Sequence, residues 1–379
     1  MKIYTKRTVL EAARERIRWV FDEFEDVVVS WSGGKDSAVI LHLALEAARD
    51  LGRLPLPVLW LDQEAEWQAV VEITRETFAS PELDPWWMQI PFRLFNATTP
   101  DQPWLNCWGP GEEWMRPQEP TAKTENRYGT DRFAPLFPAI LEREWGPKSC
   151  YLTGVRCEES PTRSLGLTTY ATYKHVTWGK AYSKPKDLYA FHPLYDWTFS
   201  DVWKTIHDAN LPYCSIYDEM YRWGESLTRM RVSNVHHETA IHQLKYLHEI
   251  ESDTWDALTK RVKGINSCAQ LGKDFLPHTL PPMFKGWREY RDHLLQHLIR
   301  ASAARDLFAH EFQRLDRTYK GMHHQEDLHR LECQVIATND TEFTKVNNWE
   351  RHPAVGHWRR YRDGKPPHPK DITNKYIHG

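Results

Sequence analysis

The stretch that decides the fold of this chain is VVVSWSGGKDS, residues 27–37. Three β-branched residues open it, a turn with Gly33 and Gly34 follows, and residues 38–48 are mostly apolar. β-branched residues favour a strand, and an apolar run of that length favours a buried helix. The first backbone N–H groups of a helix have no partner within it, and the helix dipole makes that end positive. The order strand, glycine turn and helix therefore predicts a site for an anion.

The side chains of this turn suit a phosphate group. Gly33 and Gly34 let the backbone approach an oxygen atom closely. Ser32 and Ser37 can donate hydroxyl hydrogen bonds, and Lys35 carries a full positive charge. The spacing differs from that of the common P-loop, Gly-x-x-x-x-Gly-Lys-Ser/Thr, so this is a different and shorter loop. We predict that it binds phosphate.

The composition narrows the class of protein. At 379 residues the chain can form one large or two ordinary domains with a sizeable core. A net charge of −3 creates no general attraction for nucleic acid or a membrane, although a local basic surface is compatible with it. No apolar run is long enough to span a bilayer, and no signal-type stretch opens the chain, so we expect a cytoplasmic protein. The six cysteines include no Cys-x-x-Cys pair, which argues against a zinc ribbon or a contiguous iron–sulfur motif.

Strands and helices alternate along the first half of the chain. The pattern predicts a helix at 5–25, a second buried strand at 57–62, a helix at 67–78 and a strand near 86–90. Alternation of this kind gives right-handed crossovers and a parallel sheet. We therefore predict an α/β fold with a doubly wound, mostly parallel sheet, followed by a smaller α-helical region.

Changes in composition predict the domain boundaries. Residues 96–130 are rich in Pro, Gly and Trp and are typical of a long insertion that forms a lid or a binding segment. Beyond about residue 221 strand signals nearly vanish and helical periodicity replaces them. We expect an α/β domain over 1–220 and a helical domain over 221–379. A basic, proline-rich tail at 359–369 is expected to be extended.

A second motif, TGVRCEESPTRS at residues 153–164, follows another predicted strand. Ligands of doubly wound sheets bind beyond the carboxyl ends of the strands, where the glycine turn also lies. Arg156 and Arg163 can each bind phosphate or sulfate oxygens in a fork, and Glu159 can orient one of them. The alternative is a surface loop held by salt bridges. The position of Gly154 directly after a strand favours a ligand-binding loop.

A third motif, HPLYDWTFSDVW at residues 192–203, predicts a helix at 199–209 that Thr198 or Ser200 caps. In this order the motifs SGGKDS, GxRxxESxxR and PLxDWTxxDVW resemble the phosphoadenylyl-sulfate (PAPS) reductase family of the PP-loop, adenine-nucleotide α-hydrolase superfamily. The segment LPYxxIY at 211–217 is similar as well. The resemblance covers roughly residues 25–225.

The resemblance implies a sheet with helices on both faces and an adenine nucleotide at the strand ends. It implies that the first turn holds phosphates, that Arg156 and Arg163 hold the phosphate or sulfate end, and that Asp62 lies near the adenosine. The nucleotide is ATP with Mg²⁺, or PAPS, because both share the adenosine and the α-phosphate. Asp36 is the expected metal ligand, since hard cations prefer oxygen. The expected nucleotide-binding residues are Ser30, Ser32, Gly33, Gly34, Lys35, Asp36, Ser37, Asp62, Gly154, Arg156, Glu159 and Arg163.

The chain departs from the reductase pattern where sulfur chemistry takes place. PAPS reductases carry a C-terminal Glu-Cys-Gly-Leu/Ile-His segment whose cysteine attacks sulfur, whereas the nearest imitation here, LECQV at 331–335, lacks the Gly and the His. It falls in a helical pattern, where Cys333 is expected to pack rather than react. The helical half instead resembles a reductase-like subgroup that includes the immunoglobulin-binding regulator A proteins, whose members often lie beside ParB-like partners.

Two classes of function follow. The first is an ATP-pyrophosphatase-like nucleotidyl transferase, in which Lys35, Asp36 and Arg156 act in catalysis and an acceptor is adenylated with release of pyrophosphate. The acceptor is a small molecule, a protein or a nucleic-acid base, and a PAPS-dependent reductase or sulfotransferase that uses a partner's thiol is the alternative chemistry. The second class is a nucleotide-sensing regulator whose helical half contacts a ParB-like partner.

Overall fold

The chain forms two compact units. Its computed structural model describes residues 6–99, 102–168, 171–182, 187–227, 229–232, 235–236, 240, 243–269, 279–299, 302–322, 325–338 and 340–366. The sheet unit comprises residues 1–94, 105–235 and 243–261, and the helical unit comprises 95–104, 236–242 and 262–379. Residues 221–235 and 243–261, which the sequence pattern groups with the helices, therefore pack with the sheet. Within the described ranges, no helix is both long and apolar enough to cross a bilayer.

A six-stranded sheet forms the centre of the sheet unit. Its order is β3-β2-β1-β6-β8-β7, and all neighbouring strands are parallel except β7 and β8. The strands are β1 (Asp26–Ser30), β2 (Leu56–Leu61), β3 (Leu83–Met88), β6 (Ser149–Leu152), β7 (Gly179–Ala181) and β8 (Tyr189–Phe191). The strand order reverses between β1 and β6, which is the point where doubly wound sheets bind ligands. The mostly parallel sheet confirms the predicted fold class.

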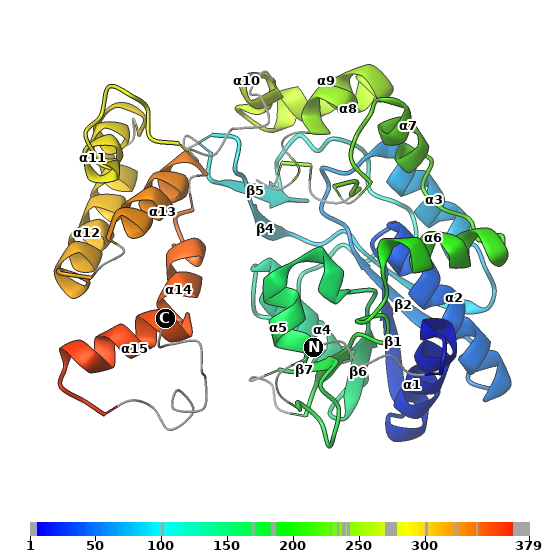
Figure 1. Cartoon of the computed structure of the whole chain (residues 1–379). Coiled ribbons are helices and arrows are strands. Elements are labelled where there is room, and N and C mark those ends of the chain that lie inside the picture. The colour runs from blue at the N-terminus through cyan, green and yellow to red at the C-terminus, as the bar shows by residue number, and fades with distance from the viewer. Residues whose placement is uncertain are drawn as a thin grey trace. The chain divides into compact units, whose positions relative to one another are not determined.

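Helices cover both faces of this sheet. Figure 1 shows α1 and α2 on one side of β1 and α4 on the other. The central strand is apolar on both sides, with Val27, Val28 and Val29 all buried, as a doubly covered strand requires. The helices of the sheet unit are α1 (Val9–Glu23), α2 (Lys35–Asp50), α3 (Gln68–Phe78), α4 (Phe133–Trp145), α5 (Pro161–Thr168), α6 (Phe199–Asp208), α7 (Ile216–Arg222), α8 (Leu244–Ile250) and α9 (Ser252–Arg261), with a 3-10 turn at Cys157–Glu159.

The helices α1, α2 and α6 of this unit begin in two different ways. α1 and α6 each begin with a capping box, in which Thr8 and Thr198 accept the backbone N–H of the third helical residue. α2 begins after Gly34, which has no side chain that could cap it. The N–H groups at the start of α2 are therefore left for other partners.

The helical unit has its own core. Its helices are α10 (Ile265–Ala269), α11 (Trp287–His297), α12 (Ser302–Thr318), α13 (Gln325–Ala337), α14 (Thr344–Glu350) and α15 (Pro353–Arg362). Phe308, Phe312 and Tyr319 of α12 and the adjoining turn are buried in that core. The expectation of an extended tail is wrong for 359–362, which form the last turns of α15, because helix geometry places three of its arginines at the favourable C-terminal end. Residues 367–369 lie outside the described residues.

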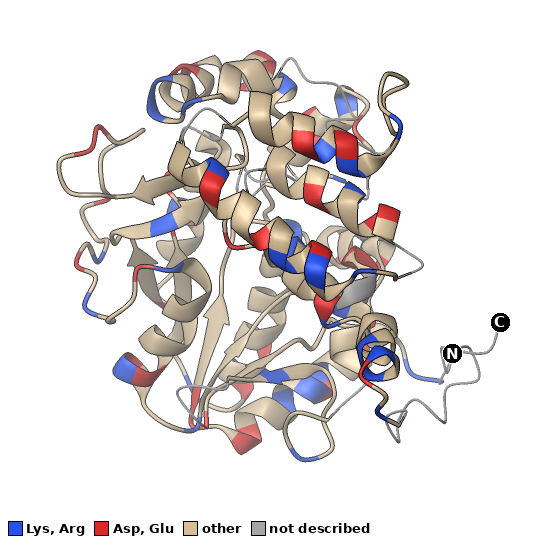
Figure 2. Ribbon diagram, turned by 90° about the vertical axis from the view of Figure 1, so that its left-hand side faces the viewer, with Lys and Arg blue, Asp and Glu red and all other residues tan. Residues whose placement is uncertain are grey.

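The predicted insertion contains regular structure. β4 (Phe92–Phe95) and β5 (Trp104–Cys107) pair as a separate two-stranded sheet, so residues 96–130 are not one continuous loop. Acidic and basic residues are interspersed along the helices, as Figure 2 shows. Surface pairs such as Arg49 with Glu82 account for part of this mixture, and it agrees with the small net charge.

Candidate functional site

The glycine loop, Ser32–Ser37, makes a sharp turn between β1 and α2. Gly33 has a positive φ of 66°, and a Cβ atom added to it would lie 2.7 Å from Cγ1 of Val70. A Cβ atom on Gly34 would lie 3.3 Å from the hydroxyl oxygen of Tyr217. Both positions therefore depend on glycine, the first for its backbone angles and its space, the second for close packing. The result is a stretch of backbone without side chains at the start of α2.

The hydroxyl groups of Ser32 and Ser37 form hydrogen bonds within the glycine loop. The Ser37 hydroxyl donates to the carbonyl of Gly34 over 2.7 Å, and the Ser32 hydroxyl donates to the Ser37 oxygen over 3.2 Å. Ser30 ends β1 opposite Leu59 of β2. These bonds fix the turn, and the expected phosphate contacts of the three serines stay predictions.

Lys35 and Asp36 open α2 with opposite charges. Lys35 is only 6% exposed, and its ammonium group lies 2.9 Å from Oδ2 of Asp36. Its backbone N–H donates to the Tyr217 hydroxyl over 3.2 Å, and its Nζ atom lies 5.2 Å from the centroid of the Tyr217 ring. Burial raises the pKa of Tyr217, so this residue places a neutral oxygen where the start of α2 would meet an anion.

Arg156 links the second motif to the glycine loop. Its side chain is buried, its Nε donates to Oδ1 of Asp36 over 2.6 Å, and its Nη1 donates to Glu158 over 2.8 Å. Gly154 permits this contact because a Cβ atom there would lie 2.7 Å from the backbone carbon and oxygen of Asp36. The loop after β6 thus packs directly against the backbone at the start of α2, because Gly154 has no side chain.

We expect Gly154→Ala to disrupt the site strongly. The new Cβ would collide with backbone atoms of Asp36, which cannot rotate away as a side chain can. The free energy of unfolding should fall by about 1–3 kcal/mol, the usual cost of overpacking, and ATP affinity should fall at least about tenfold. Denaturant unfolding and calorimetry measure the two effects. The matched control is Gly166→Ala on α5, where an added Cβ meets nothing within 4 Å; equal effects in both variants would contradict the prediction.

Arg163 shares the electrostatic environment of this site. It forms an ion pair with Glu159. Burial lowers the pKa of Arg163, and the neighbouring guanidinium groups of Arg231 and Arg156 act in the same direction, against Asp36. Burial also lowers the pKa of Arg231. Arg163 is therefore within electrostatic range of two other guanidinium groups, an arrangement that a bound anion would stabilise.

Tyr217, Arg231 and His192 belong to this site, although no role for them was predicted from the sequence. Tyr217 lies in the LPYxxIY segment, which carried part of the resemblance and was the only signal for it. Nδ1 of His192 lies 2.5 Å from the Thr153 hydroxyl, and burial lowers the pKa of this histidine to about 4, with Arg163 contributing. His192 is therefore neutral at pH 7 and adds no charge to the site.

Asp62 directly follows β2 and is fully buried. Trp87, Gln89 and Arg116 donate hydrogen bonds to its carboxylate over 2.6–2.9 Å. The carboxylate is thus held by the protein itself. The expected position of Asp62 near an adenosine stays a prediction. Both carboxylate oxygens already accept hydrogen bonds from the protein, so an adenosine there would contact the backbone at the end of the strand.

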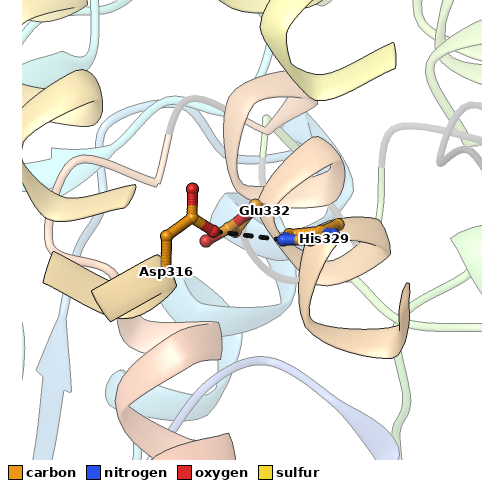
Figure 3. Close-up of side chains that lie close together, drawn as sticks. All are labelled: Asp316, His329 and Glu332. Carbon is orange, nitrogen blue, oxygen red and sulfur yellow. Dashed lines mark hydrogen bonds and ion pairs between the residues drawn. The ribbon is translucent and has the colours of Figure 1, made fainter. Parts of the chain in front are cut away.

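A buried group of side chains in the helical unit has spacing suited to a metal ion. Asp316, His329 and Glu332 offer one atom each, and these atoms lie within 4.8 Å of one another (Figure 3). Arg291, however, donates through Nη1 to Asp316 over 3.1 Å and to Glu332 over 2.7 Å. Because its guanidinium group already compensates both carboxylates, we interpret the group as an ion network that stabilises the unit.

The fold and the site together define an α/β protein with an anion-binding glycine loop at the switch point of a parallel sheet. Residues 26–83 and 132–223 match the model of the phosphoadenosine phosphosulfate reductase domain. This match confirms the resemblance to the PAPS reductase-like PP-loop superfamily that the motifs predicted. Residues 224–360 match a domain of unknown function, DUF3440.

Individual relatives cover the chain to different extents. The chain is 29% identical over 391 aligned positions to a protein of Escherichia coli K12 named uncharacterized protein YbdN, covering 93% of this chain and 95% of that protein. It is 25% identical over 207 positions to sulfate adenylyltransferase subunit 2 of Aeromonas hydrophila, covering 53% of this chain and 63% of that subunit. Among solved structures, an FMN adenylyltransferase of Candida glabrata aligns with a TM-score of 0.36 and 17% identity, over 55% of this chain and 58% of that one.

Proposed function

We propose that this protein is a nucleotidyl transferase of the ATP-pyrophosphatase type, which binds ATP at the glycine loop and adenylates an acceptor with release of pyrophosphate. The observation that carries the proposal is that three cationic side chains lie around the glycine loop and the start of α2. Lys35 stands at the start of α2, Arg156 contacts the same helical turn, and Arg163 is within electrostatic range of both Asp36 and Arg156. The match to a sulfate adenylyltransferase subunit supports adenylyl transfer.

In this reaction the acceptor nucleophile attacks the α-phosphorus of ATP, and the bond to the bridging oxygen breaks. Negative charge grows on the leaving pyrophosphate, and Lys35 and the start of α2 are placed to stabilise it. Asp36 holds Lys35 and Arg156 in position, since each of its oxygens accepts from one of them. Asp36 presents no unpaired oxygen, so its role as a Mg²⁺ ligand stays a prediction and no step passes through the metal.

Lys35→Ala tests the proposal. We expect the rate of pyrophosphate release from ATP, measured with a coupled pyrophosphatase assay, to fall about 10²–10³-fold, because loss of one charge-stabilising group has an effect of that size. The control is Lys204→Ala on α6, where Lys204 has a 73% exposed side chain and pairs with Asp208 at the surface. A wild-type protein that binds ATP without releasing pyrophosphate, with Lys35→Ala changing affinity alone, would instead identify a nucleotide sensor, which a ParB-like partner of the helical half would then read.

One observation favours PAPS as a second candidate ligand. Five of the six cysteines are buried, whereas Cys157 is partly exposed and directly follows Arg156. Cys333 is buried in α13, and burial raises its thiol pKa to about 12, so it is a poor nucleophile at neutral pH. Calorimetry with ATP, PAPS and adenosine 3′,5′-bisphosphate separates the candidates, because tight binding of the bisphosphate over ATP would exclude the first proposal.

A further inference from the structure

Three carboxylates alternate directly after β2, and two of them have arginine partners among the described residues. Asp62 accepts from Nη2 of Arg116 over 2.6 and 2.7 Å. Glu64 accepts from Nε of Arg261 over 2.6 Å and from two backbone N–H groups of the insertion. The third, Glu66, is 3% exposed and forms no ion pair with any described residue. Its carboxylate accepts a hydrogen bond from the backbone of Gln63, but a buried carboxylate without an ion-pair partner is costly, so its retention calls for an explanation.

Further polar atoms around Glu66 are buried without a hydrogen-bond partner among the described residues. Two are acceptors, Oε2 of Glu66 and Oε1 of Gln63. Three are donors, Nε1 of Trp67 together with Nε and Nη1 of Arg116. Three of these atoms lie on residues 63–67, and two belong to Arg116, which is within electrostatic range of Glu66. Native proteins satisfy the large majority of buried polar groups, so donors and acceptors of this kind are candidates for binding a polar ligand. Burial raises the pKa of Glu66 well above its usual value, and Arg116 opposes the rise.

These atoms lie next to the glycine loop. The segment 62–67 joins β2 to α3, and β2 pairs directly with β1, which leads into the loop. Val70, in the first turn of α3, is the side chain against which Gly33 packs. Arg116 comes from the insertion that the sequence marked as a binding segment. A ligand held at 62–67 would therefore be a neighbour of a nucleotide held at the glycine loop.

We propose that Glu66, Gln63, Trp67 and Arg116 form a second subsite, which binds the ammonium and carboxylate groups of a small zwitterion of the α-amino acid type. An ammonium group can donate to both unpaired oxygens, Glu66 Oε2 and Gln63 Oε1. A carboxylate can accept from Trp67 Nε1 and from the unpaired nitrogens of Arg116. The charge of Arg116 lowers the pKa of Glu66, although no ion pair joins the two side chains among the described residues. A zwitterion can bridge two groups of this kind.

The identity of this ligand as the acceptor rests on the proposed function. In that reaction a carboxylate oxygen of the amino acid attacks the α-phosphorus of ATP and forms a new P–O bond. The bond from the α-phosphorus to the bridging oxygen breaks, and pyrophosphate leaves with the electron pair. The products are an aminoacyl adenylate and pyrophosphate, and the step needs no oxidant, reductant or further co-reactant.

Calorimetry on the full chain tests the subsite without requiring turnover. The probes are the twenty standard amino acids, taken singly with ATP present, and for each binder its carboxamide and its N-acetyl derivative. We expect at least one amino acid to bind wild type, and Glu66→Gln to weaken it at least about tenfold. The derivatives, which each lack one charge, should not bind. Glu113→Gln, an exposed change in the insertion, is the matched control.

The outcomes are distinct. Glu66→Gln removes a buried carboxylate whose ionisation burial disfavours, so its thermal midpoint should be no lower than that of wild type, and its ATP affinity should be unchanged. Absence of binding by every amino acid, equal binding by Glu66→Gln, or loss of ATP affinity in that variant would overturn the subsite. Amino acid-dependent exchange of labelled pyrophosphate into ATP reports the reaction separately. Binding without exchange leaves the subsite standing and removes the proposed function.

Discussion

Arg156→Ala should both destabilise the sheet unit and abolish nucleotide binding. The buried guanidinium group holds Asp36 through Nε and ties Glu158 to the same network. Removing one partner of a buried ion pair leaves an uncompensated charge and costs about 3 kcal/mol or more. Lys35 remains beside Asp36, so the loss should lie at the lower end of that range. ATP affinity should fall at least about a hundredfold, because the variant loses the charge of Arg156 and also releases Asp36, which positions Lys35.

Denaturant unfolding and ATP calorimetry measure the two effects of Arg156→Ala. Arg49→Ala is the control, since Arg49 pairs with Glu82 through two 2.6 Å bonds on the surface, where ion pairs contribute about 1 kcal/mol or less. Arg156→Lys separates charge from geometry, because a lysine keeps the charge but cannot donate to Asp36 and Glu158 in the same fork. An Arg156→Ala variant as stable as Arg49→Ala would show that the guanidinium group does not compensate Asp36.

The fold was predictable because its signals are local. The β-branched run at 27–29, the paired glycines and the apolar helix lie within one continuous stretch, and strand–helix alternation fixes a parallel sheet. The helix at 353–362 was missed because arginines and the following prolines dominate the composition, while Pro353 at the first turn and His352 as N-cap are weaker signals. The strand at 104–107 was missed since Pro and Gly surround only four strand residues.

The site was only partly predictable because its members are far apart in sequence. The glycine loop and Arg156 follow strands β1 and β6, so topology alone brings them to one edge. Tyr217 and Arg231 approach the loop from segments about 180 to 200 residues further along the chain, and no local pattern reports such contacts. The sequence also cannot show that Glu66 lacks an ion-pair partner among the described residues, since Asp62, Glu64 and Glu66 form one uniform acidic pattern until the arginine partners are known.

Arg291→Met should cause the largest loss of stability in the helical unit. Arg291 is 4% exposed and compensates Asp316 and Glu332, while burial raises the pKa of Glu332 to about 7. Methionine keeps much of the volume but leaves two carboxylates facing each other, which should cost about 3–5 kcal/mol. Amide hydrogen exchange of α11, α12 and α13 in the full chain measures the loss. Arg330→Met, at an exposed ion pair with Asp327 on α13, is the control.

The pH dependence of Arg291→Met distinguishes lost charge compensation from lost packing. A carboxylate whose folded pKa is raised stabilises the folded state fully below its unfolded pKa, near 4.5, and this contribution is lost as the pH rises through the folded pKa, about 7 for Glu332. Without the guanidinium group that lowers it, the pKa of Glu332 should rise further, so Arg291→Met should lose less stability at pH 5 than at pH 8. Adding Glu332→Gln should restore stability chiefly at pH 8, because it removes the charge that Arg291 no longer compensates. A loss of stability that is independent of pH and not relieved by Glu332→Gln would mean that Arg291 stabilises the unit by packing. Asp316, His329 and Glu332 would then again be candidate metal ligands.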